Sequence, residues 1–477
     1  MGQISNLQCF TLTLAVCLSA FLVDTTGAMP MKTGAAPPLP ASEDREMMVR
    51  EPVFGGTVYV TEAGRKHPSS IVLVHGIGDA GARDWDHLIP ALSGQYHVVA
   101  FDLPGFGRSD KGNFSYSPEN YARFIKWVAG EYVKGPFVLI GHSLGGAIAL
   151  RYAADYPADL RRLILVDAAG ILYRISLIKE MVREKHENEE DDENESTARR
   201  AESFSTFVRF MLDGIANDKR AQKLEKSLED PSTRSVLLGG EPKKIASLAL
   251  MMENFGKDVE RVRTPTLLIW GEKDTIAPLR TARALAARLP EARLVLVPDS
   301  GHMPMREKTA EFNKLIIDDL ASAGTASYPA NPNPAGQGGG GRTAICNGQP
   351  GMVFTGHYER IALDRCDDAT ITDATVHHLD AVNSEVFIEN STLGGTGTAI
   401  TARRSEIVAT AVTIDADTAI HASHSHFDFA GSRLTAKKTI AETDNKTILL
   451  FSISHATSPG YTGPLHGTWT ITRKKAL

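Results

Sequence analysis

Short, nearly continuous apolar runs alternate with amphipathic segments between about residues 51 and 325. Six of the runs have the length and the Val, Leu and Ile content of buried strands. They are SIVLVHG (70–76), YHVVAFD (96–102), PFVLIGH (136–142), RLILVDA (162–168), TPTLLIW (264–270) and ARLVLVP (292–298). The segments 117–133 and 307–323 place apolar residues at helical spacing. This alternation predicts an α/β fold, with a mostly parallel sheet covered on both faces by crossover helices.

The alternation is interrupted between the fourth and fifth of these strands, by residues 171–263. The spacing of apolar residues in this insertion predicts helices, so we interpret it as a helical lid or cap. Two apolar stripes contain Phe204, Phe207 and Met211 in one and Met251 in the other. Either stripe can form the core of the insertion or the wall of a substrate pocket.

The chain changes character beyond residues 326–342, a Pro- and Gly-rich stretch that we interpret as a linker. In 343–477 helical spacing disappears, and an internal repeat recurs about every twenty to twenty-one residues. The repeat aligns Ser384, Ser405 and Ser425, and also Leu393, Ile414 and Leu434. We expect an all-β, solenoid-like domain, because one coil of a parallel β-solenoid has this length. It resembles parallel β-helix proteins in pattern, and a β-sandwich is the alternative.

Residues 1–28 contain a long apolar run, Leu7–Val23, followed by small residues, as in a secretory signal peptide. An uncleaved membrane anchor is the alternative, because no Lys or Arg precedes the long run. Residues 29–50 are rich in Pro, Ala and charged side chains, and we expect them to be disordered. We therefore expect a secreted or periplasmic protein, or a membrane-anchored one if the signal is retained.

The formal net charge of the 477 residues is −6, so no basic excess is available to neutralise phosphates. Nucleic acid is therefore not an expected partner. Of the four cysteines, Cys9 and Cys17 lie in the predicted signal, which leaves Cys346 and Cys366. Such a pair in an exported domain favours a disulfide, with two buried thiols as the alternative.

The stretch LIGHSLGGAIAL (139–150) places Ser143 where an apolar strand turns directly into a helix. Such a sharp turn leaves little room for Cβ atoms two residues either side, which explains Gly141 and Gly145. A serine hydroxyl held clear of the backbone can act as a nucleophile. The N–H of Leu144 then lies at the start of the helix, where it can stabilise an oxyanion.

A nucleophilic serine also needs a base and an acid that orients the base, which follow this kind of turn in the order Ser, acid, His. Asp274 comes shortly after strand 264–270, and His302 lies in a Gly-flanked loop after the last strand. Asp167 and Asp299 compete as acids, but we interpret them as a loop anchor and a turn former.

The second oxyanion donor is expected from the loop after the first of the predicted strands, IVLVHGIGDAG (71–81). There the N–H of Ile77, or less favourably that of Gly78, can face Ser143. We interpret His75 in the same loop as a residue that orders the loop rather than a proton carrier.

The motifs above occur in the order found in the α/β-hydrolase superfamily, which this chain resembles over about 51–325. The motifs are VHGIG, FDLPGFGRSD, GHSLGGAIAL, WGEKDTIAP and DSGHMPM. The resemblance implies Ser143 as nucleophile, Asp274 as acid, His302 as base, and Leu144 and Ile77 as oxyanion donors. It also places the insertion where that family carries its lid. A serine at the turn disfavours the similar dehalogenase and epoxide hydrolase branches, whereas GHSLGG looks most like lipases and esterases.

The leading hypothesis is a serine hydrolase that cleaves small-molecule esters or lipids with an apolar acyl part, without a cofactor or metal. With Ser143, Asp274 and His302 in the same roles, the alternatives are cleavage of an amide, a thioester or a carbon–carbon bond, or transfer of an acyl group. An alternative of another class is a surface or glycan-binding solenoid protein, in which 343–477 contacts polysaccharide or the cell envelope. His421, His424 and His426 lack the companion ligands of a metal site, and we expect solvent-facing side chains.

Overall fold

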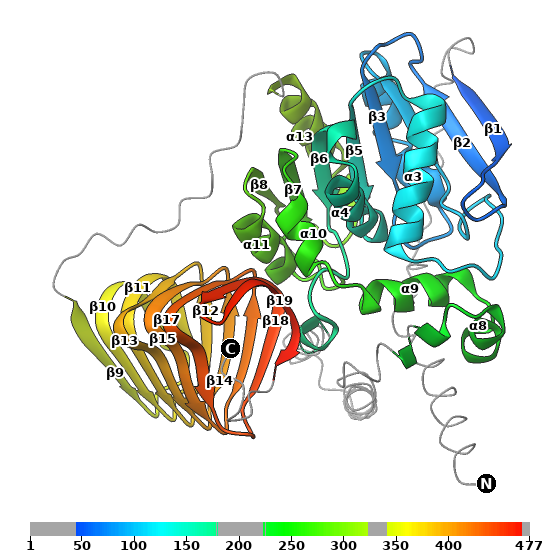
Figure 1. Ribbon diagram of the computed structural model, residues 1–477. Coiled ribbons are helices and arrows are strands. Elements are labelled where there is room, and N and C mark those ends of the chain that lie inside the picture. Colours follow the sequence, from blue (N-terminus) through cyan, green and yellow to red (C-terminus); the bar gives the residue numbers. More distant parts are fainter. Residues whose placement is uncertain (1–43, 178, 180–222, 225, 323–340, 470–477) are drawn as a thin grey trace, which may run out of the picture.

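The computed structural model describes residues 44–177, 179, 223–224, 226–322 and 341–469, which form an α/β domain and an all-β domain (Figure 1). The predicted signal peptide and nearly all of the predicted linker lie outside the described residues, as do Phe204, Phe207 and Met211. None of the described helices has both the length and the apolar character needed to cross a membrane.

An eight-stranded sheet forms the centre of the α/β domain, in the order β1-β2-β4-β3-β5-β6-β7-β8. The strands are β1 (Arg45–Arg50), β2 (Thr57–Ala63), β3 (Ser70–Val74), β4 (His97–Phe101), β5 (Phe137–His142), β6 (Leu160–Val166), β7 (Thr266–Gly271) and β8 (Ala292–Val297). The pairs β1–β2 and β2–β4 are antiparallel, and the other pairs are parallel. All six predicted strands are confirmed as β3 to β8.

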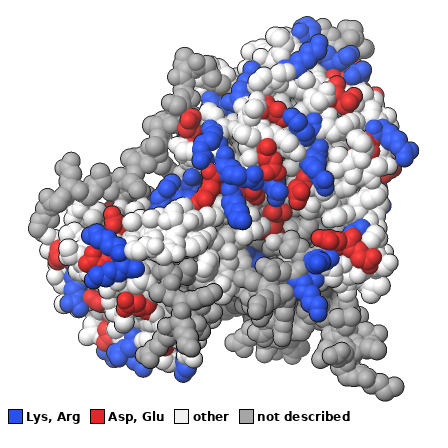
Figure 2. Space-filling view, in the orientation of Figure 1, with Lys and Arg blue, Asp and Glu red and all other residues white. Residues whose placement is uncertain are grey.

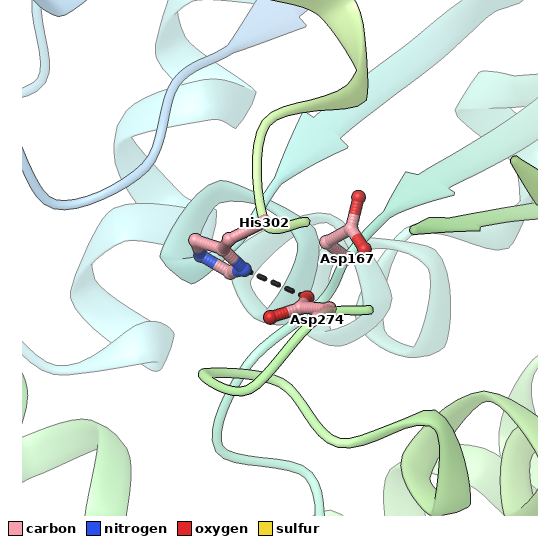
Figure 3. A group of neighbouring side chains, drawn as sticks. All are labelled: Asp167, Asp274 and His302. Atoms are coloured by element: carbon pink, nitrogen blue, oxygen red, sulfur yellow. Dashed lines mark hydrogen bonds and ion pairs between the residues drawn. The ribbon is translucent and has the colours of Figure 1, made fainter. Parts of the chain in front are cut away.

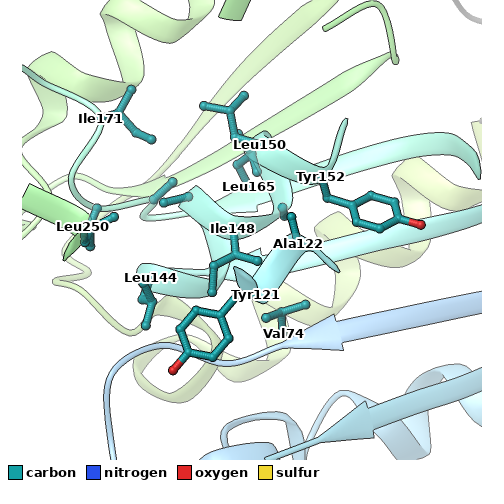
Figure 4. Close-up of a cluster of buried hydrophobic side chains, with 14 of the residues drawn as sticks. Val74, Tyr121, Ala122, Leu144, Ile148, Leu150, Tyr152, Leu165, Ile171 and Leu250 are labelled. Atoms are coloured by element: carbon teal, nitrogen blue, oxygen red, sulfur yellow. The ribbon is translucent and has the colours of Figure 1, made fainter. Parts of the chain in front are cut away.

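Alternate residues of the parallel strands enter two separate cores, which explains why these strands are apolar throughout. In β3, Val72 and Val74 belong to one core, whereas Ile71 and Leu73 belong to the other. The first core is covered by α3 (Pro118–Tyr132), α4 (Leu144–Asp155), α10 (Gly256–Arg261) and α11 (Leu279–Arg288). The second is covered by η1 (Gly81–Trp85), α2 (Ile89–Ser93), α12 (Pro304–Glu307) and α13 (Thr309–Ser322). Figure 4 shows α4 side chains among those of β3 and α3 in the first core.

The insertion between β6 and β7 is helical in its described part, as predicted, with α8 (Pro231–Leu238), α9 (Pro242–Met252) and α10. A Cβ on Gly105, after β4, would lie 2.9 Å from Pro242 of α9, and a Cβ on Gly170, after β6, 2.4 Å from Leu250. Helix α9 therefore packs on loops at the carboxyl ends of the strands. Met251 of α9 is buried in the first core.

Two predicted boundaries are wrong. Arg45–Arg50, which we expected to be disordered, form an edge strand that pairs with β2 at every residue. Met47 and Val49 contribute its apolar contacts by packing against the first core, a pattern too short to be recognised in the sequence. The all-β domain begins with β9 at Arg342, inside the predicted linker, because this residue already pairs with Tyr358 of the next strand.

The all-β domain is a parallel solenoid, so the alternative of a β-sandwich is wrong. Its strands are β9 (Arg342–Asn347), β10 (Val353–Asp364), β11 (Ala369–Val382), β12 (Glu385–Glu389), β13 (Thr392–Arg403), β14 (Glu406–Thr410), β15 (Thr413–Ser423), β16 (His426–Ala430), β17 (Arg433–Thr443), β18 (Ile448–Ser458) and β19 (Tyr461–Trp469). Eight of them close into a ring, in the order β11-β12-β14-β16-β18-β17-β15-β13 and back to β11. All strand pairs are parallel except β18–β19.

The repeat found in the sequence corresponds to the stacking of coils. Leu393 pairs with Ile414 and Ile414 with Leu434, and all three are buried inside the solenoid.

Cys346 and Cys366 of the first coils are joined by a disulfide, with their Cα atoms 6.4 Å apart. On the outside of the molecule, charged side chains of both signs are interspersed over the face seen in Figure 2.

Candidate active site

Ser143 lies at the corner between β5 and α4, with a backbone φ of 52°. This left-handed conformation is rare for residues other than glycine and marks a strained turn. A Cβ on Gly141 would lie 2.2 Å from the Gly145 carbonyl oxygen, and one on Gly145 would lie 2.4 Å from that of Val74. Both glycines are therefore steric requirements of the turn, as predicted.

His302 joins Ser143 to Asp274 through its two ring nitrogens. Its Nε2 lies 2.9 Å from the Ser143 Oγ, and its Nδ1 lies 2.8 Å from the Asp274 Oδ2 (Figure 3 shows the second contact). The Ser143 and Asp274 residues are buried and the His302 side chain is 15% exposed. With the proton on Nδ1, the imidazole donates to Asp274 and accepts the serine hydroxyl. The structure thus brings His302 together with Asp274, which lies 28 positions before it in sequence, and with Ser143, which lies 159 positions before it.

The carboxylate of Asp274 is oriented by the turn that follows β7. Its Oδ1 accepts the N–H groups of Ile276 and Ala277, at 2.8 and 3.0 Å, which leaves Oδ2 to face His302. The carbonyl of Ala277 in turn accepts the indole N–H of the buried Trp270, at 2.7 Å. A fully bonded carboxylate of this kind holds an imidazole in one orientation.

Two residues that the sequence analysis missed hold the backbone of the His302 loop. The Nε2–H of His142 donates to the carbonyl of His302 over 2.7 Å, and burial lowers the pKa of His142 well below its usual range. The Glu307 carboxylate accepts the N–H groups of Gly301 and Met303, on either side of His302. The available signals were a histidine directly before the nucleophile and a glutamate five residues after the base.

Asp167, at the end of β6, does not bond to His302 in place of Asp274. Its Oδ1 accepts the N–H of Gly271 over 2.8 Å, so it ties β6 to the end of β7, the loop-anchoring role expected of it. Burial, and then the charge of Asp274, raise the pKa of Asp167 well above its usual range. Figure 3 shows the two carboxyl groups beside each other. Asp299 is exposed and pairs with Lys273.

The two residues expected to supply oxyanion donors both lie beside the nucleophile. Leu144 is the first residue of α4, where backbone N–H groups have no acceptor within the helix. A Cβ on Gly76, which precedes Ile77, would lie 2.9 Å from the Ser143 Cβ, so this loop passes directly against the serine. His75 donates from Nδ1 to the Gly76 carbonyl and accepts the Leu103 N–H at Nε2. Its burial lowers its pKa, as suits a neutral residue that orders the loop.

Among the described residues, Asp167, Asp274 and His302 offer potential metal-ligand atoms within 4.8 Å of one another. Both ring nitrogens of His302 already bond to protein groups, so the arrangement suits proton transfer better than metal binding. In the solenoid, His421 and His424 each pair with a carboxylate on the neighbouring coil, at 3.3 and 2.7 Å, and are half-exposed.

Comparison with known proteins shows which family the fold of this chain belongs to. The model of the alpha/beta hydrolase fold family matches residues 70–309, half of the chain. Lipase 1 of Psychrobacter immobilis is 28% identical over 263 residues, which cover 54% of this chain and 78% of the lipase. A 2-hydroxy-6-oxo-6-(2'-aminophenyl)hexa-2,4-dienoic acid hydrolase of Metapseudomonas resinovorans is 26% identical over 271 residues, 54% of this chain and 86% of that enzyme. Among solved structures, a meta-cleavage product hydrolase from Pseudomonas fluorescens IP01 has a TM-score of 0.40 and 21% identity, covering 58% of this chain and 98% of its own.

Proposed function

Because the chain belongs to the alpha/beta hydrolase fold family, we propose that it is a serine hydrolase cleaving carboxylic esters with an apolar acyl part. The observation that carries this proposal is the continuous hydrogen-bonded path from the Ser143 Oγ through His302 to Asp274. It begins on a strained turn that holds the hydroxyl at the start of a helix. The similarity to a lipase supports the ester as substrate class.

In the proposed reaction, the Ser143 Oγ attacks the ester carbonyl carbon while the His302 Nε2 takes the hydroxyl proton. Asp274 keeps the imidazole in the required tautomer and stabilises the imidazolium that forms. The backbone N–H groups of Leu144 and Ile77 donate to the oxyanion of the tetrahedral intermediate. His302 then returns the proton to the departing alkoxide, which leaves an acyl-enzyme, and water deprotonated by His302 releases the carboxylic acid.

The specific observation in favour of a second candidate reaction is the similarity to a dienoic acid hydrolase. The same three residues would then cleave a carbon–carbon bond beside a ketone. The proposal commits to esters because GHSLGG resembles lipases and esterases and because an apolar insertion adjoins the carboxyl ends of the strands. The polysaccharide or envelope contact expected for residues 343–477 stays a prediction.

The test is the substitution Ser143→Ala in the full chain. We expect p-nitrophenyl ester hydrolysis to fall by about a thousandfold or more, with an unchanged melting curve, because alanine removes the nucleophile and little volume. A fluorophosphonate probe should label the parent protein on Ser143 and leave the variant unlabelled. Ser69 lies directly before the amino end of β3, whereas Ser143 lies at the carboxyl ends of the strands, so Ser69→Ala should retain full activity and labelling.

Two results would contradict the proposal: ester hydrolysis that survives Ser143→Ala, or labelling on a serine other than Ser143. An ester series of increasing acyl length, run beside a ring-cleavage dienone, separates the two candidate reactions. Turnover of the dienone with no turnover of any ester would replace the ester by the carbon–carbon bond.

A further inference from the structure

The solenoid packs on the two segments that follow β6 and β7, the strands after which Asp167 and Asp274 lie. After β6, the N–H of Tyr173 donates to the Ser452 hydroxyl of the solenoid over 2.8 Å. The Tyr173 and Ile175 side chains pack against Leu450 of β18. After β7, helix α11 lies against the solenoid (Figure 1), and a Cβ on Gly431 would be only 2.5 Å from the Ala284 Cα.

Asp428 of the solenoid bonds to both of these segments. Its carboxylate accepts two N–H groups of the Arg280 guanidinium, at 3.0 and 3.2 Å, and its carbonyl accepts a third, at 2.9 Å. The Ser176 hydroxyl, in the segment after β6, donates to the same carboxylate over 2.9 Å. The Arg280 Nε donates to the Thr410 hydroxyl. Both partners of the ion pair are 5% exposed.

The position of Asp428 in its strand is unusual for an acidic residue. Phe427 and Phe429 on either side of it are buried inside the solenoid, so Asp428 faces outward. Its neighbours in the same outward column are Val408 and Leu450, both apolar. A buried carboxylate in an apolar column is costly unless it is paired and hydrogen-bonded. Arg280 and Ser176, both from the α/β domain, provide these bonds.

The ion pair lies at the start of the helix that follows Asp274. Helix α11 begins at Leu279, so Arg280 is its second residue. The N–H groups of Ile276 and Ala277, which hold the Asp274 carboxylate, come immediately before Pro278 and this helix. A shift of the helix start would move the two donors that aim Asp274 at His302.

We propose that Asp428 is a positioning residue, through which the solenoid fixes the start of α11 and thereby the orientation of Asp274 toward His302. The solenoid is then part of the support of the active site and not an appended spacer. This inference rests on the proposed function for its catalytic consequence, but the Asp274–His302 contact can be observed without any turnover.

Helix α11 also offers a matched control. Arg283, one turn after Arg280, likewise pairs with a solenoid carboxylate, that of Glu389, at 2.6 Å. This second pair is 42% and 35% exposed and lies farther along the helix from Asp274. Arg283→Met therefore removes an ion pair across the same interface without touching the helix start.

The experiment compares Arg280→Met, Asp428→Asn and Arg283→Met in the full chain, below the melting temperature of each. The downfield proton resonance of the His302 Nδ1–H, assigned by its loss in His302→Gln, reports the bond to Asp274. We expect it to shift or broaden in Arg280→Met and Asp428→Asn and to persist in Arg283→Met. The rate of Ser143 labelling by a fluorophosphonate should fall about ten- to a hundredfold in the first two variants and stay within about twofold in the third.

A double-mutant cycle tests whether the effect passes through Asp274. In an Asp274→Asn background, Asp428→Asn should cause no further loss of labelling, because the group that it positions is already gone. An unshifted resonance together with parent-like labelling in folded Arg280→Met and Asp428→Asn would overturn the inference, even if both variants melt earlier. An unlabelled parent protein whose resonance responds as expected would instead count against the proposed function alone.

Discussion

At the scale of single residues, Asp167 and Asp274 follow the neighbouring strands β6 and β7, but their carboxyl groups have different hydrogen-bond partners. Asp274 receives two backbone N–H groups and the His302 ring, so its negative charge is well compensated. Asp167 receives one backbone N–H, from Gly271, and its buried carboxyl group lies beside that of Asp274. Burial and the adjacent Asp274 charge raise the pKa of Asp167 well above its usual range.

The raised pKa of Asp167 predicts a pH-dependent effect of Asp167→Asn. Protonated Asp167 contributes stability that is fully present below the unfolded pKa, about 3.9, and is lost as pH rises toward the folded pKa. Asparagine has the same shape and does not titrate. We therefore expect the difference in free energy of unfolding, variant minus parent, to increase as pH rises, by up to about 1.4 kcal/mol per pH unit. Urea unfolding at a series of pH values measures the gain.

Asp299→Asn is the control for this series, because its carboxylate is exposed and the ion pair with Lys273 lowers its pKa. The Asp299 carboxylate contributes stability that is present above the unfolded pKa and is lost only as pH falls through the folded pKa. The difference in free energy of unfolding between Asp299→Asn and the parent should therefore not increase with pH above about pH 4. A stability difference for Asp167→Asn that stays constant with pH would mean that Asp167 ionises as it does in water.

At the scale of elements, a ladder of serines joins successive coils of the solenoid. The Ser384 N–H donates to the Ser405 hydroxyl, and the Ser405 N–H donates to the Ser425 hydroxyl, each over 3.2 Å. The Ser405 hydroxyl in turn donates to the carbonyl of Arg403, over 3.1 Å. All three serines are buried, at corners where the chain turns from one strand to the next. The hydroxyls thus satisfy backbone groups that the strands leave unpaired at the corners.

Ser405→Ala should therefore destabilise the solenoid by about 1–3 kcal/mol, because it leaves the buried Ser384 N–H without an acceptor. Thr401→Ala is the matched substitution in the same coil, at an exposed position, and should change the free energy of unfolding by no more than about 0.5 kcal/mol. Urea unfolding followed by circular dichroism measures both. Equal effects of the two substitutions would show that water or a backbone shift replaces the hydroxyl.

Elements whose two faces are buried, or whose pattern repeats, could be predicted from the sequence. The strands β3 to β8 were recognisable because each is a continuous apolar run, and the solenoid because its coils repeat every twenty or twenty-one residues. The strands β1 and β2 lie at the antiparallel edge of the sheet, where a few apolar residues suffice for packing. The first coils lie within the predicted domain of residues 343–477, but the repeat does not mark them, because β9 and β10 carry none of the repeated serines and leave Ile345 and Val353 exposed.

Some residues of the candidate site could likewise be predicted from the sequence, and others could not. Ser143, Asp274 and His302 could be selected because each follows a recognisable strand, and their mutual contacts agree with that choice. His142, Glu307 and Asp428 could not, because their partners are backbone groups or residues far along the chain. A hydrogen bond from His142 to the carbonyl of His302, 160 positions away, leaves no pattern in the local sequence.

At the scale of the whole molecule, the first core of the α/β domain extends to residues of the solenoid. Ala430 and Ile453 of the solenoid belong to the same apolar cluster as helices α4 and α11. Gly431 lies against the backbone of α11, where a Cβ would be 2.5 Å from the Ala284 Cα and 2.6 Å from its carbonyl oxygen. Its φ of 63° is also in the region that favours glycine. The absence of a side chain at this corner is therefore what allows the domains to meet.

Substitution of Gly431 by alanine tests how firmly this contact holds the molecule together. Gly348 is the matched position, because its φ is 73° and a Cβ there meets nothing within 4 Å. Gly348→Ala should cost only the left-handed backbone strain, about 1–2 kcal/mol. Gly431→Ala pays the same strain and also overlaps α11, so its free energy of unfolding should fall by about 1–3 kcal/mol more. Faster hydrogen exchange around Ala284 should accompany that loss in Gly431→Ala alone. Equal losses in the two variants, with unchanged exchange in α11, would mean that the helix and the solenoid separate at little cost, and the solenoid could then hold neither α11 nor Asp274 in place.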